Sequence, residues 1–203
     1  MITIVKADQA EIDVRPGISE IFADGFKQWL GFFSKDPKKI AAAFAHMFVL
    51  DQFYVAINQG QVIGMAACTN GTALSVKLDK QELRKHLGLY KGTLAGVFLK
   101  KEFETPFAQP LSSAGSIEFV GTATAFRGQG VATQLIRHIL EHTPYEVYLI
   151  EEVADTNTAA MKLYNKLGFN EYKRREIPGH RAKKIGINHN VSLRLIKKPG
   201  SDA

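Results

Sequence analysis

The sequence predicts a mixed α/β domain whose sheet is parallel in its second half, and three observations support this. Two strand-then-helix units follow one another at residues 117–142 and 146–167, an order that produces neighbouring parallel strands. A hairpin pattern occupies residues 53–68. The chain has 203 residues, 45% of them hydrophobic and 23% charged, which is ordinary globular usage. No repeat or linker divides it, so we expect a single domain over residues 1–203.

Cysteine and hydrophobic patterns exclude several classes of protein. Cys68 is the only cysteine, which excludes an internal disulfide and every multi-cysteine metal motif. The first residues lack the basic and apolar regions of a signal peptide. The longest apolar run, residues 40–50, is shorter than the roughly 18 residues that span a membrane. We therefore expect a cytoplasmic protein with no membrane partner.

Positive charge is concentrated near the C-terminus. Residues 173–198 contain nine Lys or Arg and one acid, Glu176, so 9 − 1 gives +8 of a total formal charge of +6, and the rest of the chain carries −2. Such a segment suits nucleic acid, an anionic substrate or the phosphates of a cofactor. No aromatic-interleaved or recognition-helix pattern accompanies it, so we favour a solvated face over a nucleic-acid site.

The first half of the chain is predicted to contain strands and helices in mixed order. Hydrophobic spacing predicts a helix over residues 19–33 with Ser19 as its N-cap. The other predicted elements are a strand at 3–7, a helix from Asp36-Pro37 to residue 50, strands at 53–57 and 61–68 joined by Asn58-Gln59-Gly60, and a helical stretch over 79–104 broken near Gly88 and Gly92, followed by a loop at Pro106 and Pro110.

The second half is predicted as alternating strands and helices. These are a strand at 117–122, a glycine-containing turn at 126–130, a helix at 131–142, a strand at 146–153, a helix at 157–167, and edge strands at 170–173 and 191–196.

The turn between the strand at 117–122 and the following helix is suited to an anion. Gly128 and Gly130 let the main chain approach a ligand closely, and the first helical turn offers unpaired N–H donors at the positive end of its dipole. Arg127 adds a charge that can contact a phosphate. A pyrophosphate fits such a site, although a purely structural turn explains two glycines about as well.

Two segments resemble the GNAT superfamily of N-acetyltransferases. The first, Arg127-Gly128-Gln129-Gly130-Val131-Ala132, is similar to the family motif Gln/Arg-x-x-Gly-x-Gly/Ala. The second, residues 157–169, is similar to the family's Asn-x-x-Ala-x-x-Leu-Tyr-x-Lys-Leu-Gly-Phe. The resemblance covers residues 117–172 and implies a centrally splayed sheet flanked by helices, with acetyl-CoA as the co-substrate. The stretch 79–104 departs from the minimal family pattern and is interpreted as a helical insertion. Neither a dinucleotide Gly-x-Gly-x-x-Gly nor a Gly-Lys-Ser/Thr loop is present.

The resemblance implies roles for particular residues. Val120, Gly121 and Thr122 would lie on the splayed strand that binds the pantetheine arm and polarises the thioester carbonyl. The pyrophosphate would be held by Arg127, Gly128, Gln129, Gly130, Val131 and Ala132. Asn157 would bond the pantetheine arm or the diphosphate edge, and Tyr164 would protonate the departing thiolate.

Each catalytic candidate has a structural alternative. Tyr164 is also the packed aromatic of an amphipathic helix beside Leu163 and Leu167. Glu118 is either the base that deprotonates the incoming ammonium or a solvated strand carboxylate, with Glu151 and Glu152 as substitutes on the next strand.

Other side chains carry weaker predictions. The six histidines show no metal-ligand spacing, so we expect no metal and assign them to helix surfaces. Cys68 is interpreted as a buried strand residue. The aromatic residues Trp29, Phe32 and Phe33 either line an acceptor pocket or pack in the core.

The predicted function is transfer of an acetyl group from acetyl-CoA to a primary amine by direct attack in a ternary complex. A non-catalytic CoA-sensing domain, a nucleic-acid-binding protein and another acyl-CoA transferase, using a longer chain or an alcohol, are the alternatives. The acceptor, a small-molecule or peptide amine, is not identified by the sequence, and neither is the oligomeric state, for which a homodimer is one option.

Overall fold

The computed structural model describes residues 1–70, 72–104 and 114–197. The strands are β1 Ile2–Lys6, β2 Phe53–Asn58, β3 Gln61–Thr69, β4 Ala114–Thr122, β5 Val147–Ala154, β6 Asn170–Glu176 and β7 His189–Ile196. The helices are α1 Arg15–Gly25, α2 Lys27–Leu30, α3 Pro37–Phe44, α4 Lys80–Leu87, α5 Leu89–Phe103, α6 Val131–His142, α7 Thr158–Lys166 and α8 Gly179–Ile185.

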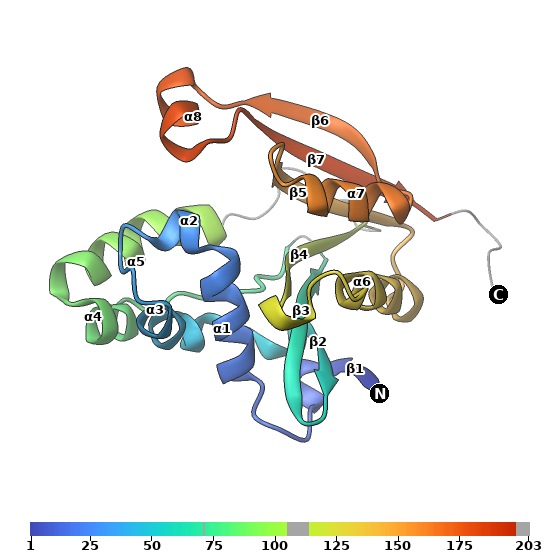
Figure 1. Ribbon diagram of the computed structural model, residues 1–203, viewed down its shortest axis with the longest axis horizontal. Helices are drawn as coiled ribbons and strands as arrows, with labels where there is room; N and C mark the ends of the chain where they lie inside the picture. Colours follow the sequence, from blue (N-terminus) through green and yellow to red (C-terminus); the bar gives the residue numbers. More distant parts are fainter. Residues whose placement is uncertain (71, 105–113, 198–203) are drawn as a thin grey trace.

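Within the described residues these strands form one sheet in the order β1-β2-β3-β4-β5-β7-β6 (Figure 1). The pairing of β4 with β5 is parallel, and every other neighbouring pair is antiparallel. The prediction of a mixed α/β sheet with a locally parallel part is therefore confirmed. The parallel part is the single pair β4–β5, and the later strands pair antiparallel.

The parallel pair is short, and the two strands then separate. The register joins Ala114 to Val147 and ends at Ser116 with Leu149, although β4 continues to Thr122 and β5 to Ala154. Beyond this point β4 pairs only with β3, and β5 pairs only with β7. The sheet is consequently splayed at its centre, as the family resemblance implies.

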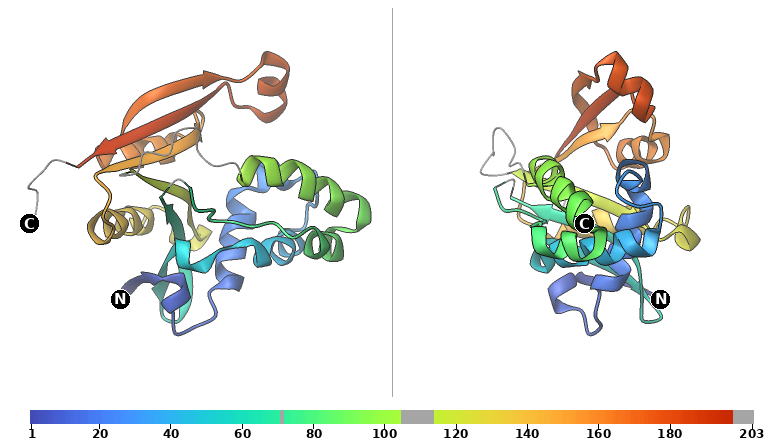
Figure 2. Two further views of the ribbon diagram at one scale, coloured as in Figure 1. Left: turned by 180° about the vertical axis from the view of Figure 1, so that it is seen from behind. Right: turned by 90° about the vertical axis from the view of Figure 1, so that its left-hand side faces the viewer.

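Helices cover both faces of the sheet (Figures 1 and 2). On one face, α1, α3, α4 and α5 enclose an apolar cluster that receives Val55 and Met65 from the sheet. On the other, α6 and α7 cover a second cluster that receives Tyr54 and Ala66. Because successive strand residues point to opposite faces, one strand supplies both clusters.

Glycine allows helices to approach the central strands closely. A Cβ on Gly64 of β3 would lie 2.6 Å from a methyl group of Val131 on α6, and one on Gly121 of β4 would lie 2.6 Å from a methyl group of Ile21 on α1. These helices therefore pack on the strands at a distance that no larger residue permits.

Several local predictions are confirmed, each for a recognisable reason. The side chain of Asp36 caps α3 by accepting a hydrogen bond from the Lys38 N–H at 2.9 Å, with Pro37 as the first helical residue. The hairpin of β2 and β3 turns through Gln59 and Gly60, both with positive φ. Gly88, with φ 84°, ends α4 as predicted.

The prediction of one helix over residues 19–33 is wrong in two respects: the helix starts earlier, and it is divided into two. Helix α1 begins four residues earlier at Arg15, with Pro16 in its first turn, and α2 is a separate element after Phe26. Ser19 is buried inside α1 and donates to the carbonyl of Pro16, so it caps nothing. The proline in the first turn was the stronger start signal.

Other boundaries also differ from prediction. Helix α3 ends at Phe44, after which the chain continues in 3-10 turns toward residue 52 rather than as one helix to residue 50. Gly92 does not break α5. A Cβ there would lie 2.5 Å from the Arg84 backbone, so this glycine permits the α4–α5 crossing. Of the two strands predicted as edges, β7 is internal, between β5 and β6, and β6 is at an edge. The predicted loop at Pro106 and Pro110 lies outside the described residues.

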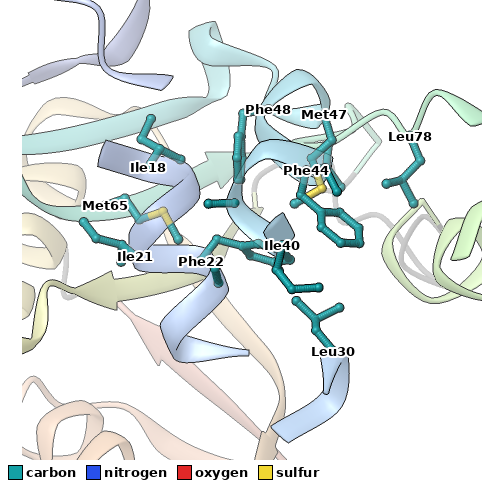
Figure 3. Close-up of a cluster of buried hydrophobic side chains, with 14 of the residues drawn as sticks. Ile18, Ile21, Phe22, Leu30, Ile40, Phe44, Met47, Phe48, Met65 and Leu78 are labelled. Atoms are coloured by element: carbon teal, nitrogen blue, oxygen red, sulfur yellow. The ribbon is translucent and has the colours of Figure 1, made fainter. Parts of the chain in front are cut away.

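Phe22 lies at the centre of the first cluster (Figure 3), where it is fully buried and its ring contacts those of Phe26, Phe44, Phe48, Phe103 and Phe119. Phe22→Ala should lower the free energy of unfolding by about 3–5 kcal/mol because it removes a buried ring and leaves a cavity. Urea denaturation measures this. The control is Phe32→Ala, whose ring is 65% exposed and whose removal should cost no more than about 0.5 kcal/mol. Equal losses for both variants would contradict the assigned core.

Candidate active site

The gap between β4 and β5 exposes main-chain groups that would otherwise be paired. Once β5 has diverged, the edge of β4 facing it has no strand partner among the described residues, so its N–H and C=O groups point into the gap. Val120, Gly121 and Thr122 lie on this stretch and are half-buried. The preceding Phe119 has φ +50°, and the β3–β4 register shifts there, so a bulge interrupts β4 at the start of the gap.

The turn after β4 has the backbone shape that the anion-site prediction requires. Gly128 and Gly130 have φ 76° and 80°, and a Cβ on either would have no atom within 4 Å, so the turn faces open space. Helix α6 starts at Val131, followed by Ala132, and no side chain caps its N-terminus. The first N–H groups of α6 are therefore free to bind an anion at the positive end of the helix dipole. The diphosphate of coenzyme A has the charge and the acceptor oxygens for this position.

Two side chains of the turn brace it rather than point toward a ligand. Arg127 forms an ion pair with Asp24 of α1 and also donates to the Thr122 carbonyl at 3.3 Å. Gln129 donates to the carbonyl of Ala125 at 3.0 Å. The hydrogen bond from Thr124 to Asp24, helped by the charge of Arg127, lowers the pKa of that aspartate. In this conformation the anion-binding donors are main-chain groups, and Arg127 fixes the turn against α1.

Asn157 performs a structural task at the start of α7. Its side-chain oxygen accepts a hydrogen bond from the Ala160 N–H at 3.2 Å, which makes it the N-cap. The cap orients the first turn of α7. Tyr164, further along the same helix, belongs to the second apolar cluster.

Tyr164 is a packed aromatic of α7, and its proton-donor role stays a prediction. The side chain is buried, and its ring lies 6.1 Å from that of Phe169 in an edge-to-face arrangement. Burial raises the pKa of Tyr164 to about 12, so the hydroxyl keeps its proton at neutral pH. A protonated phenol is the state that a proton donor to a thiolate requires.

Glu118 is half-buried and held by hydroxyl groups, so it is not a freely solvated strand carboxylate. Thr69 donates to one of its oxygens at 3.0 Å, and Ser75 donates to the other at 2.5 Å. Glu118 lies between the last β4–β5 pair and the bulge at Phe119. The carboxylate is therefore fixed beside the opening of the gap.

The two glutamates of β5 have different surroundings. Glu151 accepts hydrogen bonds from the hydroxyls of Tyr172 and Ser192. Glu152 has φ +58°, at a bulge in β5, and pairs with Arg175 at 2.5 Å while also accepting from Asn190. The charge of Glu152 is thus offset by a cation.

Sequence reasoning missed the partners of these carboxylates. Thr69, Ser75, Tyr172 and Ser192 come from segments distant in the sequence, and isolated hydroxyl residues carry no pattern that would mark them. It also missed the contact between α2 and α8, in which the Gln28 side chain donates to the Ile185 carbonyl. Figure 1 shows α8 projecting beyond β6 and β7 on the side of α2.

Other candidates are placed more simply. Phe33 is in the first cluster, whereas Trp29 and Phe32 are exposed. His138 and His142 stack on α6 with ring centroids 3.9 Å apart. No group of three metal-ligating side chains occurs in residues 1–70, 72–104 and 114–197. The same ranges contain no helix long and apolar enough to cross a membrane.

A splayed central sheet, an uncapped helix behind two left-handed glycines and a buried tyrosine occur here together. The model of the Acetyltransferase (GNAT) family matches residues 18–169, three quarters of the chain. The chain belongs to the GNAT acetyltransferase family. It is accordingly an acyltransferase, of a family that uses acetyl-CoA.

Solved structures of this family share the fold. An N-acetyltransferase from Staphylococcus aureus Mu50 is 21% identical with a TM-score of 0.59, over 96% of this chain and 100% of that one. The ribosomal-protein-S18-alanine N-acetyltransferase from Escherichia coli is 18% identical with a TM-score of 0.52, over 100% and 99%. A putative acetyltransferase from Salmonella typhimurium, solved with its cofactor acetyl-CoA, is 14% identical with a TM-score of 0.57, over 98% and 96%. The comparison with curated protein sequences found no match to this chain.

Cys68 is a structural residue of this acyltransferase. It is buried on β3, and burial raises the pKa of its thiol to about 12. Alkylation by iodoacetamide at pH 8 should be slower in the folded than in the unfolded protein by roughly 100-fold or more, because the thiolate is the reactive form. Mass spectrometry follows the reaction. Rapid labelling of the native protein, or loss of acetyl transfer in Cys68→Ala with an unchanged melting temperature, would contradict this.

Proposed function

We propose that this protein transfers an acetyl group from acetyl-CoA to a primary amine, which attacks the thioester directly in a ternary complex. The observation that carries the proposal is the uncapped N-terminus of α6 behind Gly128 and Gly130, immediately beyond the parted strands. This arrangement provides main-chain donors for the diphosphate and, on β4, for the pantetheine arm. The cofactor would thus run from the turn into the gap.

Glu118 and Tyr164 are the groups that we assign to the two proton transfers that the reaction needs. Glu118, fixed by Thr69 and Ser75, takes a proton from the incoming ammonium directly or through water. Main-chain N–H groups of β4 near Val120 stabilise the oxyanion that forms at the carbonyl carbon. Tyr164 donates its proton to the sulfur as the carbon–sulfur bond breaks. No enzyme nucleophile is needed, in agreement with the buried, protonated thiol of Cys68.

The alternatives predict different behaviour. A non-catalytic CoA-sensing domain would bind the cofactor and acetylate no amine. An acyltransferase for longer chains would use a larger acyl-CoA in preference to acetyl-CoA. A nucleic-acid-binding role rests on residues 173–198, but in the described part of this segment Arg174 pairs with Glu171 and Arg175 pairs with Glu152. Part of that positive charge is therefore neutralised within the protein.

The diphosphate site is tested by Gly130→Ala. An added Cβ would occupy the space in which the ligand lies and would strain the backbone at φ 80°. We expect the acetyl-CoA dissociation constant to rise about tenfold or more, as measured by calorimetry. The matched control is Gly60→Ala in the β2–β3 hairpin, where φ is 74° and a Cβ also meets no atom within 4 Å. The same backbone strain arises there, so acetyl-CoA affinity should not change. An equal effect of both variants, or no binding by the native protein, would refute the site.

The proton-donor role is tested by Tyr164→Phe. Loss of the hydroxyl should lower kcat by about 10²- to 10⁴-fold while the acetyl-CoA dissociation constant stays nearly constant, because the proton is needed only as sulfur departs. Release of free CoA in the presence of an amine library measures kcat. Tyr54→Phe, which changes another buried tyrosine of the same cluster, should leave kcat nearly unchanged. Unchanged turnover in Tyr164→Phe would remove this tyrosine from the mechanism.

A further inference from the structure

Two carboxylates lie at equivalent places on the two strands that separate. The last parallel pair is Ser116 of β4 with Leu149 of β5. Glu118 and Glu151 are each two residues beyond it, and each precedes the bulge in its own strand. Side chains two residues apart in a strand share a face, so the two carboxylates lie on the same face of the sheet, one on either side of the opening.

Both carboxylates are held by neutral donors. Glu118 accepts from Thr69 and Ser75, and Glu151 accepts from Tyr172 and Ser192, with one hydroxyl on each carboxylate oxygen. A carboxylate has about four acceptor sites, so each retains acceptor capacity. Within the described residues neither forms an ion pair, and the two half-buried negative charges are therefore not offset by direct cation contact.

The basic side chains of β6 and β7 near Glu151 contact other groups or are exposed. Arg175 pairs with Glu152, and Arg194 lies over the Tyr172 ring at 5.6 Å from its centroid. Lys173, opposite Ser192 in the β6–β7 register, is exposed. These three side chains therefore form no ion pair with Glu118 or Glu151 among the described residues.

A third oxygen points to a ligand at the same place. The hydroxyl of Ser116 has no hydrogen-bond partner although the residue is only 2% exposed. An unsatisfied buried hydroxyl is costly, so natural structures retain one where something else bonds to it. Ser116 shares the face of Glu118 by strand alternation and lies at the last β4–β5 pair. Ser116 therefore lies where the opening begins, on the same face of the sheet as the two carboxylates.

We propose that the acceptor binds as a primary ammonium between Glu118, Glu151 and the Ser116 hydroxyl, and that Glu151 determines specificity for an amine over an alcohol. This rests on the proposed acetyl transfer. A primary ammonium has three N–H donors and one positive charge, which match three acceptor groups of which two are anionic. An alcohol brings one donor and no charge, and it would leave both carboxylates without a cation.

The protons and bonds of the reaction balance with these groups. The ammonium gives one proton to Glu118, and the resulting amine forms the carbon–nitrogen bond. The carbon–sulfur bond breaks, and the thiolate takes the proton of Tyr164. The second proton lost by nitrogen replaces it on the tyrosine, and the first leaves Glu118 for solvent. Glu151 takes no part in these proton transfers and acts only as a binding group.

The test of Glu151 is the isosteric variant Glu151→Gln, which retains polar atoms for Tyr172 and Ser192 but removes the charge. The probe is the primary amine of a library with the highest kcat/KM, assayed beside the alcohol of the same carbon skeleton. We expect KM for the amine to rise about 10- to 100-fold, as for loss of a charged hydrogen bond, with little change in kcat. The acetyl-CoA dissociation constant should be unchanged. Glu146→Gln, which removes an exposed charge just before β5, is the control and should change none of these.

Ser116→Ala gives an independent measurement. Removal of a buried hydroxyl without a partner should leave the melting temperature unchanged or raise it. The same variant should raise KM for the amine several-fold, as for loss of one neutral hydrogen bond. A purely structural role for Ser116 would not weaken amine binding in a protein of equal or greater stability.

The outcomes separate this inference from the proposed function. If acetyl-CoA is bound and amines are acetylated, but KM for the amine is unchanged in both Glu151→Gln and Ser116→Ala, the ammonium site is refuted and acetyl transfer stands. If the alcohol is acetylated as well as the amine, the assignment of specificity is refuted. If no amine in the library is acetylated, both proposals fail.

Discussion

The loss of pairing between β4 and β5 after Ser116 and Leu149 is the constraint on which the site depends. A continuous parallel sheet would satisfy the main-chain groups of both strands and leave no opening. Here the bulges at Phe119 and Glu152, both with positive φ, redirect the two strands just beyond their last pair. Main-chain groups of β4 then face the gap, and Glu118 and Glu151 lie where it begins.

The helices packed on the sheet hold this gap open. Helix α1 packs closely on β4 at Gly121, and α6 packs closely on β3 at Gly64, so the β4 side of the opening is fixed by close helix contacts. Arg127 extends the same support to the turn through its ion pair with Asp24 of α1. The first turn of α6 is consequently held in place although no side chain caps it, and its N–H groups stay free for a ligand. The rigidity of the phosphate site thus comes from packing, and its affinity for anions comes from the main chain.

Burial and hydrogen bonding act on different groups of the candidate site. Desolvation keeps Tyr164 protonated and hence able to donate, and the same effect keeps the Cys68 thiol unreactive. The carboxylates are instead supported by hydroxyl donors, which favour an anion without neutralising it. Helix α7 therefore supplies a protonated phenol, and strands β4 and β5 supply carboxylates without a paired cation. These are the groups that the proposed transfer from a thioester to an ammonium uses.

The sequence by itself determined the elements whose signals are local. The glycines of the turn, the start of α6 at Val131, the cap at Asp36 and the hairpin at Gln59-Gly60 follow from backbone preferences within a few residues. Only the tertiary structure decided what depends on distant contacts: the place of β7 inside the sheet, the use of Arg127 as a brace, and the hydroxyl partners of Glu118 and Glu151. The physical reason is that side-chain partners are chosen by packing between segments that can be more than a hundred residues apart, as for Asp24 and Arg127. Such choices have no local signature.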